Sequence, residues 1–518
     1  MSLVNNSTIA MAIAMDHVSL ELDHSGYGCD WQNWPSVVDW ESFQLQGHDD
    51  FQDLIESMMD DGGLVLAPDW AVEIEGSHEE SHSNSNSNSN SNSNSSESTN
   101  MLVDEENDED YKGLKLVHLL IAAAEALDGS KSRDLARVIL VRLKEMVSDG
   151  TKTNMERLAA YFTEALQGLL ESSVGVHKHH HSDHSHSHST QSSHNHNHNH
   201  NLHQSQTDIL TAFQLLQDMS PYVKFGHFTA NQAILEAVAH DKRVHIVDYD
   251  IMEGIQWASL MQALVSRKEG PPDPHLRITA ITRGGSSGRR SIGTVQETGR
   301  RLIAFATSFG QPFSFHQCRL DSDETFRPSV LKLVRGEALV VNCMLNLPHF
   351  NFRAPDSVSS FFSGAKSLNP RIVTLVEEEL GLGPVGKPDF LGRFMDTLHH
   401  YSAVYDSLEA GFPMQSRARA LVERVFLGPR ISGSLARIYR NREKPEETSS
   451  WGDWLATTGL KPVTMSSANH CQAKLLLSLF NDGYMVEDVA TNKIVLGWKL
   501  RRLLSASVWT TSSSDSDY

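Results

Sequence analysis

The sequence lacks the features that mark secreted and membrane-embedded proteins. It holds only four cysteines, with no CxxC pair and no closely spaced framework: Cys29, Cys318, Cys343 and Cys471. Such sparse thiols are typical of a reducing compartment. The first residues carry no positively charged segment, and no apolar run approaches the roughly 20 residues of a transmembrane helix. We therefore expect a soluble intracellular protein without an integral membrane segment.

Basic residues are almost absent from the first part of the chain. Residues 1–113 contain 24 acidic side chains and a single basic one, Lys112, so their formal charge is −23, against −21 for the whole chain. The remaining residues are close to neutral, at +2. This balance excludes an overall basic surface of the kind that drives nucleic-acid binding, although a local basic patch stays possible.

Residues 1–112 interleave these acids with large apolar side chains, and then pass into a Ser-Asn repeat at 83–94 and an acidic run at 104–110. The tryptophans of this part are Trp31, Trp34, Trp40 and Trp70. Because such a segment cannot bury enough apolar area to offset its chain entropy, we predict a disordered acidic tail over 1–112. Acids mixed with aromatics are typical of activation segments that contact the transcription machinery. A solvated segment without a partner is the alternative for the Ser-Asn repeat.

Apolar residues recur at helical spacing between residues 114 and 170, which predicts three amphipathic helices. Helical spacing resumes at 209–219 and 231–239, and residues 113–240 are predicted to form a helical cap. Within the cap, residues 172–207 are a His/Asn/Ser-rich insert without apolar periodicity, for which we expect a disordered surface loop. We expect no functional metal site there, because no cysteine and only one internal acid could fix the ligand geometry.

Beyond residue 240 the period changes, and short β-branched runs alternate with helical stretches. The predicted strands lie at 243–248, 276–282, 313–318, 338–345 and 371–376. This alternation predicts an α/β fold, with a Rossmann-like, methyltransferase-like, doubly wound and mostly parallel sheet. Three strand-like runs after Trp451 are expected to add antiparallel strands at one edge. Residues 241–513 are predicted as this core.

A single glycine stands where a nucleotide-binding turn needs three. The first predicted strand ends in Asp248 and Asp250, and Gly254 leads into the next helix. In a G-x-G-x-x-G turn the backbone approaches the pyrophosphate closely, whereas here Glu253 would place a negative charge beside it. The sequence therefore predicts no cofactor and no catalysis, and the two acids are expected to cap the following helix and to meet nearby cationic side chains. The alternative is a Rossmann-fold methyltransferase-like enzyme or a small-ligand-binding protein.

Five sequence blocks, in order, resemble those of the plant GRAS family of transcriptional regulators. They are the Leu-rich stretch 115–124, the block 244–248 with its following Gly, Gln and Trp, a second Leu-rich stretch at 294–345, and two terminal blocks around residues 394–409 and 451–509. The resemblance implies that residues 113–513 form one GRAS domain without a cofactor. The family motifs imply structural roles for Val244, His245, Asp248, Trp257, Tyr401, Trp451, Trp498 and Trp509.

Three features resemble the branch of this family that acts in legume root symbiosis: the segments 249–253 and 341–345, and the acidic tail. This resemblance implies a regulator of nodulation and mycorrhizal signalling that is located in the nucleus, with the nuclear envelope or endoplasmic reticulum as a further location before stimulation. It implies a heterodimer with another GRAS protein, which supplies most of the contact with promoter DNA.

The family pairs through its first Leu-rich region, which implies a set of partner-binding residues in the cap. They are Leu116, Leu119, Leu120, Leu127, Leu158 and Glu236. The apolar faces of amphipathic helices are more often core than interface, and Glu236 is a solvated residue in the alternative interpretation. Candidate DNA-proximal residues are Arg289, Arg290, Arg300 and Arg301, although such short clusters are more often solvated surface arginines.

Overall fold

The computed structural model describes residues 98–129, 133–147, 153–173, 208–266, 274–282, 295–321, 323–345, 347, 353–380, 389–411, 416–442 and 450–511. Residues 1–97 of the predicted tail and almost all of the His-rich insert lie outside this part of the chain. Helix α4 (Ser98–Asp128) begins before the predicted cap. Residues 98–112, which were assigned to the tail, are therefore helical, in keeping with the helix-forming Met, Leu and Glu among them.

A nine-stranded sheet forms the centre of the molecule, in the order β3-β2-β1-β4-β5-β9-β8-β7, with β6 paired to β9. The parallel part contains β1 (Arg243–Tyr249), β2 (His275–Thr282), β3 (Phe313–Arg319), β4 (Ala338–Met344) and β5 (Ile372–Glu378). The antiparallel part contains β6 (Lys461–Pro462), β7 (Tyr484–Ala490), β8 (Lys493–Trp498) and β9 (Arg501–Thr510). The predicted α/β fold with a mostly parallel sheet is confirmed.

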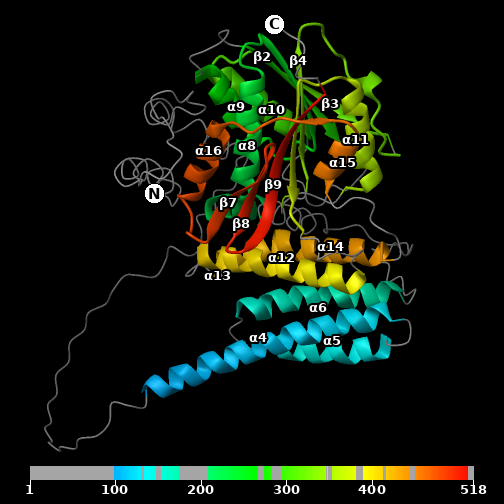
Figure 1. The fold of residues 1–518 in the computed structure, drawn as a ribbon, viewed down its shortest axis with the longest axis vertical. Helices are drawn as coiled ribbons and strands as arrows, with labels where there is room; N and C mark the ends of the chain where they lie inside the picture. Colours follow the sequence, from blue (N-terminus) through cyan, green and yellow to red (C-terminus); the bar gives the residue numbers. More distant parts are fainter. Residues whose placement is uncertain are drawn as a thin grey trace, which may run out of the picture.

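Helices cover both faces of this sheet, as the alternation of buried residues along β1 requires. Val244 and Ile246 face one core and Val247 and Tyr249 face the other. The first core lies under α8 (Tyr222–Ala237), α9 (Ile255–Ser266), α10 (Val295–Ser308) and α16 (Ser467–Leu477). The second lies under α11 (Pro355–Ser367) and α15 (Trp451–Thr457) (Figure 1). Strands buried on both faces explain the nearly continuous apolar runs in the sequence.

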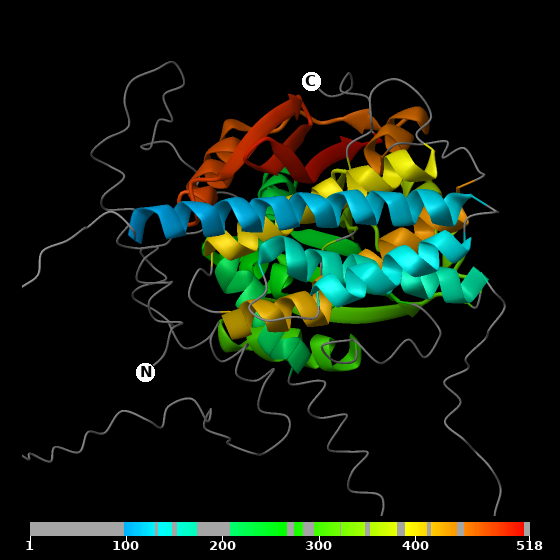
Figure 2. The same ribbon diagram turned by 90° about the horizontal axis from the view of Figure 1, so that it is seen from below.

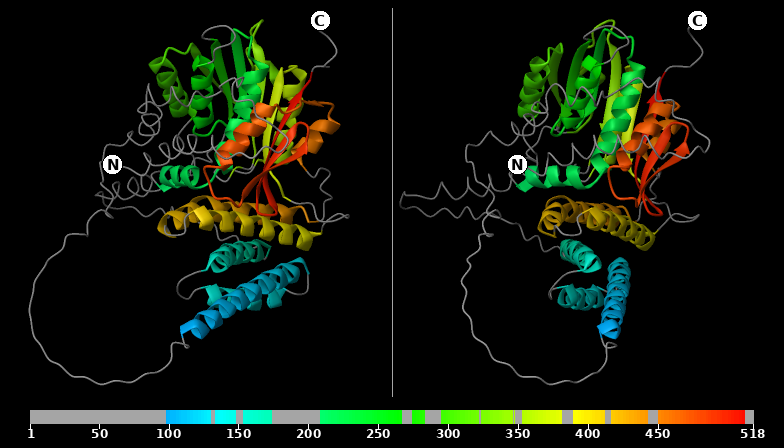
Figure 3. Two further views of the ribbon diagram at one scale, coloured as in Figure 1. Left: turned by 60° about the vertical axis from the view of Figure 1, so that its left-hand side comes forward. Right: turned by 90° about the vertical axis from the view of Figure 1, so that its left-hand side faces the viewer.

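A separate helical layer lies below the sheet (Figures 1 and 3). Its outer part is α4, α5 (Arg133–Val147) and α6 (Asn154–Ser173), which face the viewer when the molecule is seen from below (Figure 2). Its inner part is α12 (Phe390–Gly411), α13 (Ser416–Val422), the π-helical turn η3 (Glu423–Leu427) and α14 (Gly428–Arg440). The layer therefore differs from the predicted cap 113–240, because α12–α14 join it and α8 packs on the sheet. Helix α8 is buried over most of its length, which suits a sheet cover.

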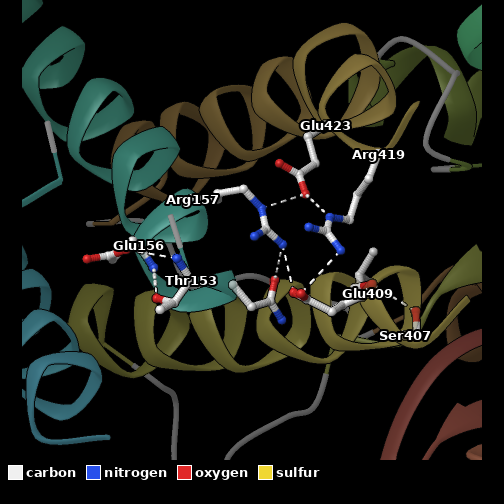
Figure 4. Close-up of polar contacts among 9 residues, drawn as sticks. Thr153, Glu156, Arg157, Ser407, Glu409, Arg419 and Glu423 are labelled. Atoms are coloured by element: carbon white, nitrogen blue, oxygen red, sulfur yellow. Dashed lines mark hydrogen bonds and ion pairs between the residues drawn. The ribbon is translucent and has the colours of Figure 1, made fainter. Parts of the chain in front are cut away.

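A buried ionic network joins the two parts of the helical layer (Figure 4). Arg157 of α6 donates to the carboxylates of Glu409, at 2.8 Å, and Glu423, at 3.1 Å. Arg419 of α13 approaches the same two carboxylates at 3.2 and 3.7 Å. The two arginines balance the two glutamates, which is the condition under which buried charges are tolerated. The network thus fixes α6 against α12 and α13 in one orientation.

Aromatic packing surrounds this network and leaves little freedom for the outer helices. The Phe162 ring of α6 lies 5.7 Å from that of Phe394 and 6.4 Å from that of Tyr401, both on α12. The Tyr161 ring covers Gly428 at the start of α14 so closely that a Cβ atom there would approach it to 2.5 Å. Only glycine lets α6 and α14 approach each other in this way.

Replacing Arg157 tests how much the fold depends on the ionic network. In Arg157→Met the buried Glu423 loses its closest cation, and removing one partner of a buried ion pair typically costs about 3–5 kcal/mol. We expect a marked fall of the melting temperature, measured by circular dichroism. The control is Arg142→Met, which removes an exposed pair with Glu145 on α5 and should cost less than about 1 kcal/mol. Equal melting temperatures for the two variants would contradict a stabilising role.

Candidate functional site

A row of buried polar side chains crosses the central strands β1, β4 and β5, and it begins near the carboxyl end of β1, at the edge where Rossmann-like enzymes bind their ligands. Asp248 of β1 is in register with Asn342 of β4, which is in register with Thr374 of β5. All three side chains are buried. Because residues in register point to the same face, their polar groups meet under α8 and α9. This row is the centre of the candidate site.

Both carboxylate oxygens of Asp248 already accept hydrogen bonds from the protein. The indole N–H of Trp257 donates to one oxygen at 2.8 Å, and the side-chain amide of Asn342 donates to the other at 2.9 Å. Burial raises the pKa of Asp248 to about 7, although these two hydrogen bonds oppose the rise. Asp248 and Trp257 therefore contact each other, and this contact joins β1 to α9.

The row continues into the covering helices through two amides. Gln256 of α9 exchanges hydrogen bonds with Asn342 at 3.1 and 3.2 Å, and also donates to the side-chain oxygen of Asn231 on α8 at 3.2 Å. The Thr374 hydroxyl donates to Asn342 at 2.7 Å. Three strands and two helices thus share one hydrogen-bond network. Its donors and acceptors serve each other, which is the pattern of a cohesive core rather than of a ligand site.

The turn that would hold a phosphate is closed by side chains. Asp250, Met252 and Gly254 have φ angles of 75°, 49° and 80°, all in the left-handed region. A Cβ atom on Gly254 would lie 2.8 Å from the Thr298 methyl group, so the close packing of α10 also requires this glycine. Glu253 is buried in the same turn. The single glycine is therefore required by the backbone conformation of the turn and by its packing against α10.

Asp250 contacts a cationic side chain, as we expected from the sequence. It forms an ion pair with Arg353, whose guanidinium lies 5.2 Å from the centre of the Tyr249 ring. The Tyr249 hydroxyl in turn lies 2.8 Å from the Ser357 hydroxyl of α11. Asp248 differs, because its partners are an indole and an amide rather than a cation.

His245 lies on the opposite face of β1 and is held as a neutral side chain. Arg277 donates to its Nδ1 at 2.8 Å, and Nε2 lies 2.8 Å from the Thr279 hydroxyl. Burial, together with the positive charge of Arg277, lowers the pKa of His245 to about 3. The arginine is itself paired with Glu337. His245 therefore connects neighbouring strands, and its neighbour Val244 is a core residue.

Two adjacent glutamates at the end of β5 hold elements of the terminal blocks. Glu377 accepts hydrogen bonds from the backbone N–H groups of Trp451, at 2.8 Å, and Gly452, at 3.0 Å. Burial raises its pKa to about 7. Burial acts in the same direction on Glu378, but the Arg430 guanidinium at 2.9 Å lowers its pKa to about 2. Sequence reasoning missed both glutamates, although two acids directly after an apolar strand were a usable signal.

The remaining aromatic residues of the family motifs also pack within the chain. The Trp498 indole donates to Asp406 of α12 at 2.6 Å, and that of Trp509 donates to the Ser507 hydroxyl at 2.9 Å. The Tyr401 hydroxyl lies 3.3 Å from the Ser434 hydroxyl of α14. Of these contacts, the one between Trp498 and Asp406 connects the helical layer with the antiparallel part of the sheet.

The predicted partner-binding residues fall into two groups. The side chains that are buried in the helical layer are Leu116, Leu120, Leu127 and Leu158. Leu119 is half-buried, and Glu236 is exposed on α8, where it accepts a hydrogen bond from the Ser466 hydroxyl at 2.6 Å. Burial gives the four leucines a packing role, so a partner could reach only their exposed neighbours.

An exposed apolar stripe on α5 was not among the predicted residues. Leu135, Val138 and Val141 are 57%, 67% and 60% exposed. Their spacing of three residues places them along one side of the helix, while Ala136 and Leu140 face the core. A run of aliphatic side chains in water is unfavourable unless a partner covers it. The sequence contains a signal for this stripe: α5 has more apolar residues than its buried face needs, and the additional ones must be exposed.

The candidate DNA-proximal arginines are not all within the described residues. Arg289 and Arg290 lie outside them. Arg300 is exposed on α10, 4.0 Å from Glu297, and Arg301 is half-buried and donates to the Thr298 hydroxyl at 3.4 Å. An acid of the same helix therefore offsets part of this charge. No helix of the described residues is long and apolar enough to cross a membrane.

The fold and the family motifs identify the class of protein. Residues 116–510 match the GRAS domain family, and the chain belongs to this family. Its members are transcriptional regulators rather than enzymes. The crystal structure of SCL7 from Oryza sativa is similar, with a TM-score of 0.58 and 30% identity, and the match covers 76% of this chain and 99% of that one.

Within the family, the chain is similar to two proteins of legumes. It is 65% identical to Protein NODULATION SIGNALING PATHWAY 2 of Medicago truncatula, over 95% of this chain and 94% of that protein. It is 63% identical to the protein of the same name from Lotus japonicus, with the same coverage.

The raised pKa of Asp248 predicts a pH dependence of stability. A carboxyl group whose pKa is higher in the folded than in the unfolded chain stabilises the fold below its unfolded pKa, and this contribution is lost as the pH rises through the folded value. Between about pH 5 and 8, the melting temperature should therefore fall more steeply for the natural chain than for Asp248→Asn, which cannot ionise. The exposed Asp134→Asn is the control. Parallel curves for all three proteins would refute the assignment.

Proposed function

We propose that this protein is a nuclear transcriptional regulator of nodulation and mycorrhizal signalling that acts as a heterodimer with another GRAS protein. The observation that carries the proposal is the similarity, over nearly the whole chain, to two legume proteins that are named for nodulation signalling. The mycorrhizal role, the heterodimer and the nuclear location go beyond those names, and they come from the resemblance of the sequence to this branch of the family.

The outer surface of the helical layer is the proposed contact with the partner. It includes the first Leu-rich stretch, 115–124, on α4 and the stripe Leu135, Val138 and Val141 on α5. The arginines beside the stripe pair with acids of the same helix, Arg137 with Asp134 and Arg142 with Glu145. The stripe is therefore electrically balanced and suited to an apolar partner helix. Leu119 and Glu236 are kept as further contact residues.

Promoter recognition is assigned mainly to the partner. The chain beyond residue 113 is almost neutral, and binding to DNA phosphates draws its affinity from unpaired cations. The acidic segment before it has the composition of an activation segment, with acids, tryptophans and phenylalanines in alternation. In this division of work, the present chain contributes contacts with the transcription machinery.

The variant Val138→Asp tests the partner surface. Placing a charge in an apolar contact should weaken binding to co-expressed GRAS partners of the same plant at least about tenfold. Because Val138 is exposed in the single chain, the melting temperature should stay unchanged. Ile303→Asp on α10, the same kind of change at another exposed aliphatic residue, is the control, and Glu236→Lys tests the predicted α8 contact. Unchanged affinity for Val138→Asp would place the partner surface elsewhere.

Removing the acidic segment tests its role in transcription. A chain without residues 1–97 should keep its melting temperature within about 2 °C and its affinity for the partner, but should lose most of its reporter activation in plant cells. Deleting only the Ser-Asn repeat 83–94 is the matched control and should leave activation unchanged, because that repeat carries neither acids nor aromatics. Full activation by the shorter chain would exclude an activating role.

A further inference from the structure

An exposed apolar and basic surface lies on the segment that connects β3 with β4. Val330, Leu333 and Val334 are 53%, 47% and 45% exposed. Lys332 and Arg335 alternate with them and are exposed as well. These five residues are called the 330–335 surface below. Three aliphatic side chains within five positions of a connecting segment form a small apolar patch with cations at its margin.

The 330–335 surface has a firm support. Leu331, within the segment, is buried in the core beneath α11. The Phe326 ring lies 5.3 Å from that of Phe361 on α11, and it fills the space that a Cβ atom on Gly364 would need. Backbone hydrogen bonds of 3.1 Å hold the turn before the surface. The exposed side chains are therefore presented in a fixed arrangement, which reduces the entropy cost of binding.

The charge of this surface is not compensated within the described part of the chain. Neither Lys332 nor Arg335 has an ion pair among the described residues. Lys332 lies close enough to His316 of β3 to help lower the pKa of that histidine, after burial and the charge of Arg277. The nearby Glu337 is already paired with Arg277. An acidic, apolar ligand would satisfy both the exposed aliphatic side chains and the cations.

The stripe on α5 does not offer this combination. Its arginines are compensated by Asp134 and Glu145 of the same helix. An acidic ligand on α5 would therefore meet carboxylates as well as cations. The two exposed apolar surfaces thus select different ligands, and only the 330–335 surface favours an acidic one.

We propose that the 330–335 surface binds the chain's own N-terminal segment at residues 31–59. This segment contains six acidic residues and no lysine or arginine. Its large apolar side chains are Trp31, Trp34, Trp40, Phe43, Phe51, Leu54, Ile55, Met58 and Met59. Aliphatic side chains flanked by cations are complementary to such a sequence both in polarity and in charge.

The length of the chain allows this contact. Residues 60–97 separate the segment from the start of α4, and 38 residues can span up to about 125 Å when extended. Helix α4 itself, with 31 residues, is about 46 Å long. The connection can therefore pass along the helical layer and reach the sheet. Because the segment is tethered to the same chain, its effective concentration at the surface does not depend on protein concentration, and no second molecule has to be recruited.

Binding would cover the tryptophans that an activation segment presents to its targets. Release by a competing acidic ligand, or by a change at the surface, would make them accessible again. The contact itself does not depend on the proposed role in transcription, because it follows from polarity and charge alone. Its failure would leave that role untouched.

A photo-crosslinking amino acid in place of Leu333, in the full chain, tests the proposal. After irradiation, mass spectrometry should locate crosslinks to residues 31–59. A mixture of isotopically heavy and light chains should show that both halves of each crosslink come from the same chain. The same amino acid in place of Ile303, which is 46% exposed on α10, is the control and should give no crosslink to that segment.

Charge reversal completes the test. The double variant Lys332→Glu with Arg335→Glu should reduce the crosslink yield at least about fivefold and leave the melting temperature unchanged. Crosslinks to other parts of the chain, crosslinks between heavy and light chains, or a yield that is insensitive to the charge reversal would each overturn the proposal.

Discussion

At the carboxyl edge of the sheet, the side chains of Asp248 and Asp250 are bound by the protein's own donors, and the packing of the central strands depends on these contacts. In related folds this edge stays open, because the ligand binds there. Here Trp257 and Asn342 occupy both oxygens of Asp248, and Arg353 occupies Asp250. A carboxylate that is buried in this way is stable only while its donors stay in place. Strands β1, β4 and β5 and helices α8 and α9 are therefore held together by one buried hydrogen-bond network.

In the helical layer, buried polar side chains also satisfy each other, but there they form ion pairs instead of hydrogen bonds between amides. Arg157 and Glu423 come from distant parts of the chain, and their contact is possible only when α6 lies on the inner helices. Ion pairs of this kind add orientation more than stability, since the loss of solvation offsets much of the attraction. With the inner face fixed, the outer face of α5 is left as a rigid apolar surface. The apolar stripe of α5 is thus presented in a fixed arrangement, which reduces the entropy cost of any contact that covers it.

The local periodicities were sufficient to predict the mostly parallel sheet and the outer helices, because buried strands and amphipathic helices leave regular patterns of apolar residues. They could not show which helices share a layer. The apolar pattern of α12 indicates that one face of the helix is buried, but it does not indicate whether the sheet or α6 covers that face. Contacts such as Asp250 with Arg353, or Arg157 with Glu423, join residues more than a hundred positions apart. Gly254 in the turn after β1 was informative because the conformation of a turn depends on residues that are adjacent in the sequence.

The stripe on α5 and the 330–335 surface differ in their charge. The arginines beside the stripe on α5 pair with acids of their own helix, whereas neither Lys332 nor Arg335 forms an ion pair among the described residues. The two surfaces also lie on different sides of the molecule, one below the inner helices and the other on the β3–β4 connection beside α11 (Figure 1). An apolar partner helix and an acidic segment would therefore not compete for the same place. Because the acidic segment is joined to α4, which packs against α5 and α6, a partner on the outer helices would contact the same rigid layer from which that segment starts.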